Sequence, residues 1–292
     1  FSGNSISSIN VLSNVNLTYL GCSYNAFSNI DVSSLSNLTT FRCNSNPLLN
    51  TLNLSNLSNL ELLDCSENNM SSLDTSNLQN LKQLTCQNNQ ITSLDLSNNV
   101  NLEYIYVSAN LLTSLDLSQL TIVNAPVPEY IVNVSNNPNL TYLNLKNGIP
   151  FMGSYMNTAN CPNLSFICVD EESYTAVYDA LTMSNATMPG STTVVENVQI
   201  NSYCSFIPGG TNNSVIGEFT MDINNNGCDA ADYHPQNIKV LINDGTSFGT
   251  TFSNASGNYF FYNQTGNFTI TPQFENPYFT LSPTSAILNF PS

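Results

Sequence analysis

A nine-residue pattern recurs along the first third of the chain, with leucine or a similar residue at positions one and four, cysteine at position six and asparagine at position nine. Four copies start at Leu17, Leu38, Leu60 and Leu81, and a fifth starts at Leu102 with valine in place of cysteine. Successive copies begin 21 or 22 residues apart. A fixed period of this length indicates units that stack on their neighbours. A chain with these repeats is expected to form a solenoid with one continuous core.

The spacing also predicts how each repeat is built. The stretch from position one to position six is one short strand with its leucines and cysteine facing inward, and stacking the repeats about 4.8 Å apart makes a parallel sheet. The asparagine at position nine, such as Asn25, turns the chain and bonds backbone groups of its own and neighbouring turns. A second motif lies between the copies, for example Leu-Asp-Leu-Ser at residues 94–97, and predicts a wall opposite the first.

The eight cysteines divide into two groups. Cys22, Cys43, Cys65 and Cys86 share the inward position, which three degenerate repeats starting at Leu120, Leu140 and Leu164 are expected to continue through Ala125, Leu145 and Val169. We predict that these four are reduced and buried, because bridges between adjacent rungs would be strained. The other four, Cys161, Cys168, Cys204 and Cys228, are candidates for disulfides that close the end of the solenoid. They allow three pairings, among which the sequence does not choose, although we favour Cys168 with Cys204.

The period changes after residue 169. Tyr174, Val177, Tyr178 and Leu181 have the spacing of one helical face, so we predict a short helix that caps the last repeat together with a strand-like run over 193–200. Short strands are expected at 215–221, 238–243, 247–253, 259–262, 268–271 and 278–282. The fold class is therefore mainly β. The predicted domains are a leucine-rich solenoid over 1–169, a cap of helix plus strand over 170–207, a linker over 208–214, and a small antiparallel Ig-like β-sandwich over 215–292.

One loop of the second domain suits a calcium ion. Oxygen-bearing side chains alternate before Gly227, and further carboxylates follow it, but Tyr233 stands where an EF-hand has its glutamate. The candidate metal-binding residues are Asp222, Asn224, Asn226, Cys228, Asp229 and Asp232. The alternative is a turn rich in Asn and Asp that holds no ion.

The outward positions of the strands predict a ligand-binding face. The candidate residues are Tyr19, Arg42, Tyr104, Tyr106, Tyr142 and Phe166. Exposed aromatic rings on a rigid sheet, flanked by amides, suit sugar rings or a protein partner. The alternative is that tyrosine simply has a high strand propensity. A second outward lane comprises Asp31, Asn53, Asp74, Asp95, Asp116 and Asn133, which we expect to be solvated and bonded to nearby serines rather than bridged by calcium.

Composition excludes several classes of function. The 4 Lys and Arg residues against 20 Asp and Glu give a net charge of −16, which cannot neutralise a row of phosphates or hold a polybasic membrane contact. No apolar run is long enough to insert into a membrane. The sequence contains no HExxH, GxSxG or Walker motif, and its single histidine, His234, lies beside Pro235. We therefore predict a binding protein and not an enzyme.

The repeats over about residues 1–170 resemble the short bacterial class of the leucine-rich repeat family. Residues 217–232 resemble the start of SdrD-B-like and carboxypeptidase-regulatory-like modules of bacterial surface proteins. The NxPNLxxL-type repeats, together with residues 161–171, 201–210 and 224–232, are similar to secreted proteins of gliding, Flavobacterium-type Bacteroidetes. That resemblance implies export by the type IX secretion route, with a sorting domain beyond Ser292.

These inferences predict an extracellular or bacterial cell-surface module for recognition and adhesion, which binds a protein or glycan through the strand face. The alternative is a structural surface protein that belongs to a larger secreted assembly or associates with copies of itself. The sequence leaves the ligand and the oligomeric state open.

Overall fold

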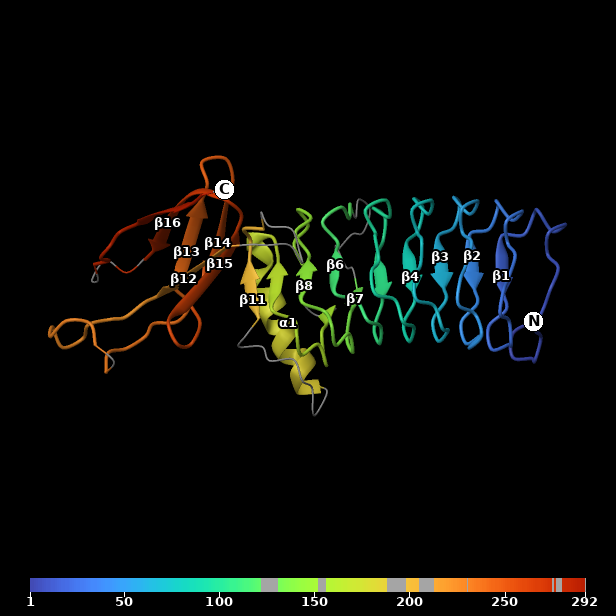
Figure 1. The fold of residues 1–292 in the computed structure, drawn as a ribbon, viewed down its shortest axis with the longest axis horizontal. Helices are drawn as coiled ribbons and strands as arrows, with labels where there is room; N and C mark the ends of the chain where they lie inside the picture. Colours follow the sequence, from blue (N-terminus) through green and yellow to red (C-terminus); the bar gives the residue numbers. More distant parts are fainter. Residues whose placement is uncertain are drawn as a thin grey trace.

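The computed structural model describes residues 1–121, 131–151, 156–187, 198–204, 213–229, 231–274, 276 and 280–291, with side chains omitted for 184–187. The blue-to-green part of Figure 1 is a long row of short strands, and the orange and red part is a second, antiparallel domain. The yellow helix lies between them at the end of the row. Among the described residues, no helix is both long and apolar enough to cross a bilayer.

The first wall of the row is a seven-stranded parallel sheet, which we call sheet A. Its strands, in spatial order, are β1 (Tyr19–Gly21), β2 (Thr40–Arg42), β3 (Leu62–Asp64), β4 (Gln83–Thr85), β5 (Tyr104–Tyr106), β7 (Ile131–Asn133) and β9 (Met156–Asn157). In the first five strands the middle residue is buried, because each strand presents position four of the repeat to the core. The repeats stay in register, with Leu20 opposite Phe41 and Phe41 opposite Leu63.

The opposite wall becomes a second parallel sheet, which we call sheet B. Its strands, in spatial order, are β6 (Ser114–Asp116), β8 (Tyr142–Asn144), β10 (Phe166–Cys168) and β11 (Gln199–Asn201). Strand β6 ends in the Leu-Asp-Leu-Ser motif at residues 115–118 and includes its first two residues, so this motif does form the predicted second wall.

The predicted phase of the degenerate repeats is wrong. Strand β5 pairs with β7, which contains residues assigned to the second motif, and β6 pairs with β8, which was expected to continue the cysteine wall. The physical reason is one longer turn, since the repeat asparagine after Asn110 is Asn137, 27 residues further on. The cysteine lane therefore continues to Val134, while Leu145 and Val169 lie on the opposite wall. The copy expected from Leu120 lies mostly outside the described residues.

A ladder of asparagines ties successive turns together, as the repeat predicts. Asn89 donates from Nδ2 to the backbone oxygen of Cys86 in its own turn at 3.0 Å, and to that of Cys65 in the preceding turn at 3.1 Å. Its Oδ1 accepts the N–H of Met70 at 3.0 Å. The same three-way pattern recurs at Asn25, Asn46, Asn68, Asn110 and Asn137. Each ladder asparagine thus satisfies backbone groups that no strand pairs.

The residue before each ladder position has a left-handed backbone. The φ angles are 56° at Tyr24, 56° at Ser45, 55° at Glu67, 55° at Asn88, 52° at Ala109, 56° at Asn136 and 58° at Asn160. This conformation is unfavourable for most residues with a Cβ atom, so the turn imposes strain that the hydrogen-bonded ladder overcomes.

The cysteine lane is apolar and reduced, as predicted. Cys22, Cys43, Cys65 and Cys86 are free thiols with no exposed surface. Burial raises the pKa of the Cys22 and Cys86 thiols to about 12, since a thiolate would be desolvated there.

Cys161 does not take part in the disulfide network that the sequence suggested for it. It is a buried thiol that occupies the next position of the asparagine ladder. Its Sγ lies 3.3 Å from the backbone oxygen of Val134, where an asparagine amide donates in the earlier turns. This assignment follows from the corrected phase of the repeats.

The solenoid ends in the predicted helical cap. A single 3-10 turn, Glu171–Ser173, leads into helix α1 (Tyr174–Thr187), which packs against β9 and β11. Val177 and Leu181 are buried, whereas Tyr178 is exposed. Of the run expected at 193–200, residues 193–197 lie outside the described residues, and the rest leads into β11.

The C-terminal domain is a small antiparallel sandwich, as predicted. One sheet pairs β12 (Asn213–Glu218) with β15 (Asn258–Asn263), and the other has the order β14 (Phe248–Phe252), β13 (Lys239–Asn243), β16 (Gly266–Gln273) and β17 (Ala286–Phe290). The sheets share a core of Val215, Val240, Ile242, Phe261, Phe268 and Ile270. The strand predicted at 278–282 is wrong for 280–282, which form no strand, and 277–279 lie outside the described residues. Of the expected linker, 208–212 lie outside them too.

The sandwich is anchored on the last rungs of sheet B. Cys168 and Cys204 form the favoured disulfide. The Asn201 amide donates to the backbone oxygen of Phe260 at 2.9 Å, and Lys239 pairs with Glu171. The hydrogen bond and the ion pair thus join the two domains, while the disulfide ties the segment that follows β11 to β10.

Candidate functional site

The outer face of the first five strands of sheet A is the candidate binding surface, which we call the sheet A face. Its outward side chains form two lanes in register, Tyr19, Thr40, Leu62, Gln83 and Tyr104 in one, and Gly21, Arg42, Asp64, Thr85 and Tyr106 in the other. The inward residues hold the backbone rigidly, because each is packed in the core. A partner would meet a flat array of hydroxyl, amide and aromatic groups.

Tyr19 lies along its strand at one end of this face. A Cβ atom built on Gly21 would come within 3.0 Å of the Tyr19 hydroxyl oxygen, so glycine leaves room for the ring to lie over the backbone. Tyr19 is still 57% exposed. The next rung places Arg42 beside Gly21.

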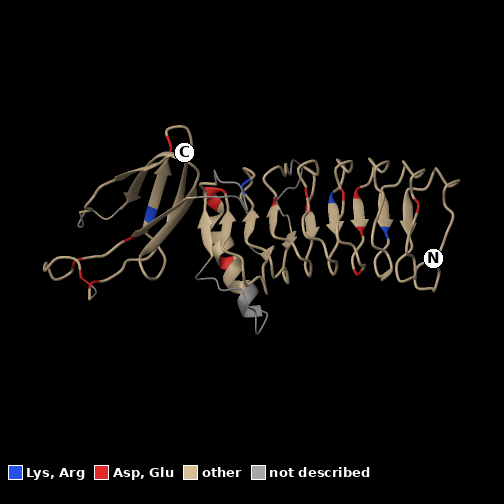
Figure 2. Ribbon diagram, in the orientation of Figure 1, with Lys and Arg blue, Asp and Glu red and all other residues tan. Residues whose placement is uncertain are grey.

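Arg42 is an exposed cation that the described residues do not pair. Its neighbour across the register is Asp64, whose Oδ1 accepts the Ser66 N–H at 3.2 Å and the Ser66 hydroxyl at 2.7 Å. The other basic side chains are engaged elsewhere: Lys82 pairs with Glu61, Lys146 donates to the Ser202 backbone oxygen, and Lys239 pairs with Glu171. Figure 2 shows how few basic residues the molecule has.

Tyr104 and Tyr106 mark the other end of the face. They are alternate residues of β5 and therefore point to the same side, about 7 Å apart along the strand. Tyr104 is 38% exposed and Tyr106 is half-buried. Four rungs separate Tyr104 from Tyr19, a distance of roughly 19 Å at the usual strand spacing.

Tyr142 and Phe166 do not belong to this face, so their prediction as ligand-binding residues is wrong. Both lie on sheet B, where their rings stack with centroids 5.7 Å apart. Tyr262 of the sandwich packs edge-on against Phe166 at 5.3 Å. Both are buried in the domain junction, and this burial raises the pKa of Tyr142 well above its usual value. The misplaced repeat phase is the cause, because it put them on the wrong wall.

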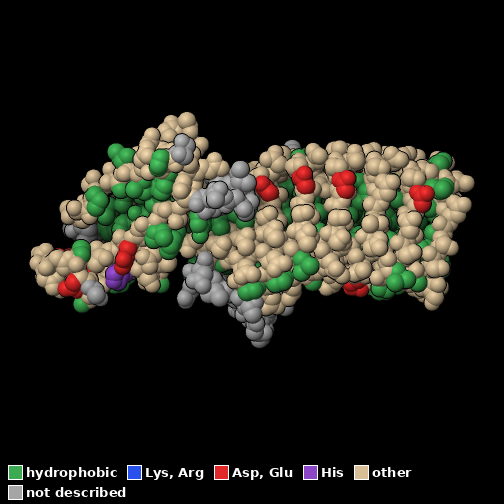
Figure 3. Space-filling model, in the orientation of Figure 1, with side chains coloured by type: hydrophobic (Ala, Val, Ile, Leu, Met, Phe, Trp, Pro, Cys, Tyr) green, Lys and Arg blue, Asp and Glu red, His purple; other side chains and the backbone are tan. Residues whose placement is uncertain are grey.

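The acidic lane runs along the second wall, and a row of acidic side chains is visible along the upper edge of the solenoid in Figure 3. Each carboxylate or amide accepts the N–H of the residue two positions later, as seen at Asp31, Asn53, Asp74, Asp95 and Asp116. The hydroxyl groups of Ser33 and Ser76 lower the pKa of Asp31 and Asp74 respectively, and the backbone N–H groups of the same serines lower it further. The expected bonds to nearby serines are confirmed for these five residues, but Asn133 lies on sheet A, and Asn144 takes the next place in the lane.

In the candidate calcium loop the oxygens gather around Asn226. Its backbone N–H lies 3.2 Å from Asp222 Oδ1 and 3.0 Å from Asn224 Oδ1, and its Nδ2 lies 3.1 Å from Asp229 Oδ2. Asp232 instead accepts the Asp229 N–H at 2.9 Å. The exposed Cys228 is a free thiol. Within the described part of the chain, no three His, Cys, Asp or Glu side chains are grouped as metal ligands. A cation would have to displace the amide of Asn226.

No protein-family model matches the sequence, and no curated protein matches it. The similar solved structures are leucine-rich repeat proteins. The functional domain of InlJ from Listeria monocytogenes, described as including a cysteine ladder, is 21% identical over 92% of this chain and 72% of that chain, with a TM-score of 0.37. An internalin, InlF, of the same species is 21% identical over 61% of this chain and 56% of that chain, with a TM-score of 0.38.

A third similar structure is the leucine-rich repeat protein LIC12759 from Leptospira interrogans. It is 16% identical over 55% of this chain and 56% of that chain, with a TM-score of 0.35. The leucine-rich repeat solenoid assigned to this chain is established by its own repeat, its two parallel walls and its asparagine ladder.

Proposed function

We propose that this chain is a non-catalytic recognition module that binds a protein or glycan through the sheet A face. The observation that carries the proposal is the exposure of Tyr19, Arg42 and Tyr104 on a rigid sheet whose fold does not use their outward groups. Aromatic and arginine side chains contribute most strongly to binding when they are presented on a fixed scaffold.

The rest of the solenoid surface supports this choice of face. On the second wall, the side-chain oxygens of the acidic lane already accept hydrogen bonds from neighbouring backbone N–H groups. The last rungs of this wall are covered by the sandwich. On the sheet A face, Asp64 is bonded to Ser66 in this way, whereas Tyr19, Arg42 and Tyr104 remain exposed. The amides and hydroxyls of this face are suited to hydrogen bonds with sugar hydroxyls or with a peptide backbone.

The proposed location is extracellular or at a bacterial cell surface, where the module would serve adhesion. The Cys168–Cys204 disulfide supports it, because such bonds persist in oxidising compartments. Residues 161–171, 201–210 and 224–232 support the further proposal of a Bacteroidetes protein exported by the type IX route.

Calcium binding by the loop at 222–232 is also a proposal. The convergence of Asp222, Asn224 and Asp229 on one residue supports it. Added calcium should then raise the melting temperature of the sandwich, and EDTA should reverse the rise, because a ligand bound only by the folded state stabilises it. A melting temperature that ignores both additions would contradict this part of the proposal.

The binding proposal is tested by changing Tyr104 and Tyr106 together to alanine. We expect the variant to lose binding to the glycans or proteins that the unaltered chain captures on glycan and protein arrays. The matched control is Tyr178→Ala, which removes an exposed tyrosine from helix α1 instead. If the double variant bound its ligand as well as Tyr178→Ala does, the sheet A face would not be the binding surface. If the chain captured no ligand on the arrays but formed oligomers at rising concentration, a structural, self-associating protein would be favoured.

A further inference from the structure

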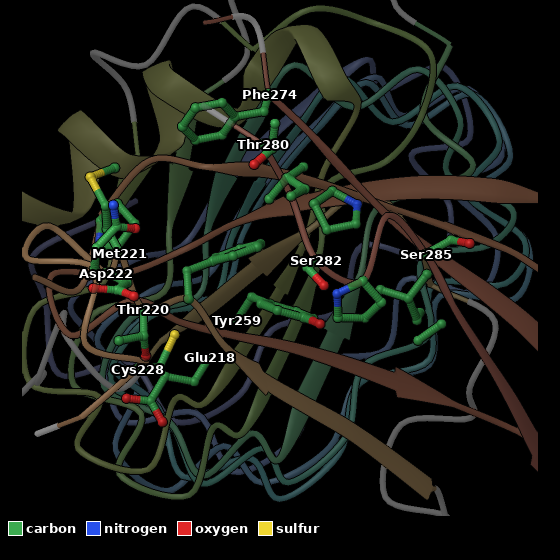
Figure 4. Close-up of a pocket in the computed structure, with 18 residues that line it drawn as sticks. Glu218, Thr220, Met221, Asp222, Cys228, Tyr259, Phe274, Thr280, Ser282 and Ser285 are labelled. Atoms are coloured by element: carbon green, nitrogen blue, oxygen red, sulfur yellow. The ribbon is translucent and has the colours of Figure 1, made fainter. Parts of the chain in front are cut away.

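The sandwich contains a cleft that the recognition face does not involve. It has a volume of about 710 Å³ and lies where β12 and β16 end and β17 begins. In Figure 4, Tyr259 lies across its centre, with Phe274 and Thr280 on one side and Glu218 and Cys228 on the other. This volume is within the range of typical ligand sites. The cleft could not be predicted from the sequence, because its walls come from segments up to about seventy residues apart.

The charged groups of the cleft all carry the same sign. Its lining is otherwise apolar or neutral, and the two ionised side chains in it are Glu218 and Asp222. His234 faces Glu218, with Nδ1 3.0 Å from Oε1, and Lys239 of β13, the neighbour of β16, pairs with Glu171. Among the described residues, no lysine or arginine lines the cleft. A ligand with an apolar body and a positive charge would therefore be complementary to it.

Two strand edges flank this cleft. Among the described strands, β12 pairs with β15 alone and β17 with β16 alone, so each has an edge without a strand partner. The inward side chains of β17, Ala286, Leu288 and Phe290, are only half-buried, because a two-stranded sheet faces a four-stranded one. An extended peptide can bond such edges through its backbone while a side chain enters a neighbouring pocket.

We propose that the cleft binds an extended, basic peptide segment of a partner protein. An apolar side chain of the segment would enter beside Tyr259, and an adjacent lysine or arginine would pair with Glu218 and Asp222. The strand edges favour a peptide over a small amine, which has no backbone to offer them. A second copy of the chain is disfavoured, because each copy carries a net charge of −16 and has only 4 Lys and Arg residues.

Cys228 provides a direct readout in the full chain. Among the described residues it is the exposed free thiol, and it lines the cleft. The probe is the amidated hexapeptide Lys-Phe-Lys-Val-Lys-Phe, added in EDTA buffer so that metal ions do not compete for Asp222. We expect the peptide to slow alkylation of Cys228 by iodoacetamide at least threefold at saturation. A fluorescent form should lose about tenfold in affinity in the Glu218→Gln, Asp222→Asn double variant, because two exposed ion pairs are removed.

The controls separate the charge effect from folding. Glu103→Gln removes a carboxylate from the solenoid and should leave the affinity unchanged. An unaltered alkylation rate of Cys228 in the double variant without peptide shows that the loop has kept its structure. Three results would overturn the proposal: equal protection by Glu-Phe-Glu-Val-Glu-Phe, unchanged affinity in the double variant, or equally tight binding of phenethylamine, which would make the cleft a small-amine site. None of these results depends on whether the sheet A face binds a ligand.

Discussion

Replacing one ladder asparagine should cost far more stability than replacing an exposed one. In Asn89→Ala, the buried Met70 N–H loses its acceptor, which costs about 1–3 kcal/mol for an unsatisfied group. The two carbonyls that Asn89 contacts keep one donor each, since Asn68 still bonds Cys65 at 2.8 Å and Asn110 still bonds Cys86 at 3.0 Å. The two lost bonds add about 0.5–1.5 kcal/mol each. The expected total is roughly 2–6 kcal/mol.

A second substitution at the same site tests the direction of the hydrogen bonds. Asn89→Asp keeps the shape of the side chain but replaces the donating nitrogen by an oxygen that faces two carbonyl oxygens. At neutral pH it should be more destabilising than Asn89→Ala, because a buried carboxylate would lack donors on that side. The control is Asn53→Ala, which removes an exposed amide bonded to Ser55 and should cost less than about 1 kcal/mol.

Urea unfolding followed by circular dichroism measures all three variants. Repeat proteins can unfold in parts, so the midpoint and the slope of each transition should be compared with those of the unaltered chain. The reasoning would be refuted if Asn89→Ala and Asn53→Ala lowered the midpoint equally, or if Asn89→Asp proved milder than Asn89→Ala at pH 7.

Three further predictions concern the left-handed turns, the buried thiols and the disulfide. Ala109→Gly should stabilise the chain by roughly 1 kcal/mol in urea unfolding, because it relieves a left-handed φ of 52°. The control Ala176→Gly, in helix α1, should destabilise the chain by a similar amount, and an Ala109→Gly variant that is no more stable than the unaltered chain would show that the turn is not strained. The buried thiols of the cysteine lane should resist iodoacetamide while Cys228 reacts. Burial raises the pKa of Cys22 and Cys86 from 9.0 to about 12, so the free energy of unfolding should be constant below pH 9 and fall as the pH rises towards 12; unfolding that is independent of pH in this range would be contrary evidence. Replacing both Cys168 and Cys204 by serine should lower the free energy of unfolding by roughly 3–4 kcal/mol, because the bond restricts a loop of 36 residues in the unfolded chain. An unchanged melting temperature would show that the disulfide does not stabilise the protein.

The repeated part of the fold could be predicted because its determinants are local. The lane of Cys22 to Cys86 and the ladder from Asn25 to Asn110 recur at a nearly constant spacing, so counting residues is enough to place them. The later repeats could not be placed by counting, because one longer turn changes which of their residues belong to which wall. One signal was available, since residues 134–138, Val-Ser-Asn-Asn-Pro, are similar to Cys-Asn-Ser-Asn-Pro at 43–47.

The residues of the candidate site that belong to the regular repeats were placed correctly from the sequence. Tyr19, Arg42, Tyr104 and Tyr106 lie on the outer side of sheet A because strand alternation puts them there. Burial of Phe166 could not be predicted, because it depends on where the sandwich docks, and docking is decided by contacts between distant segments. The cleft is hidden from sequence reasoning for the same reason.

The Cys168–Cys204 bond also has a mechanical consequence. Its two cysteines are 36 residues apart, and the segment between them contains helix α1. Fully extended, that segment would reach roughly 120 Å. When the chain is pulled from the sandwich end, the covalent bond carries the load directly into β10 and bypasses this segment. The segment between the two cysteines therefore cannot extend under load. The molecule should stay short and stiff under tension until sheet B itself unfolds.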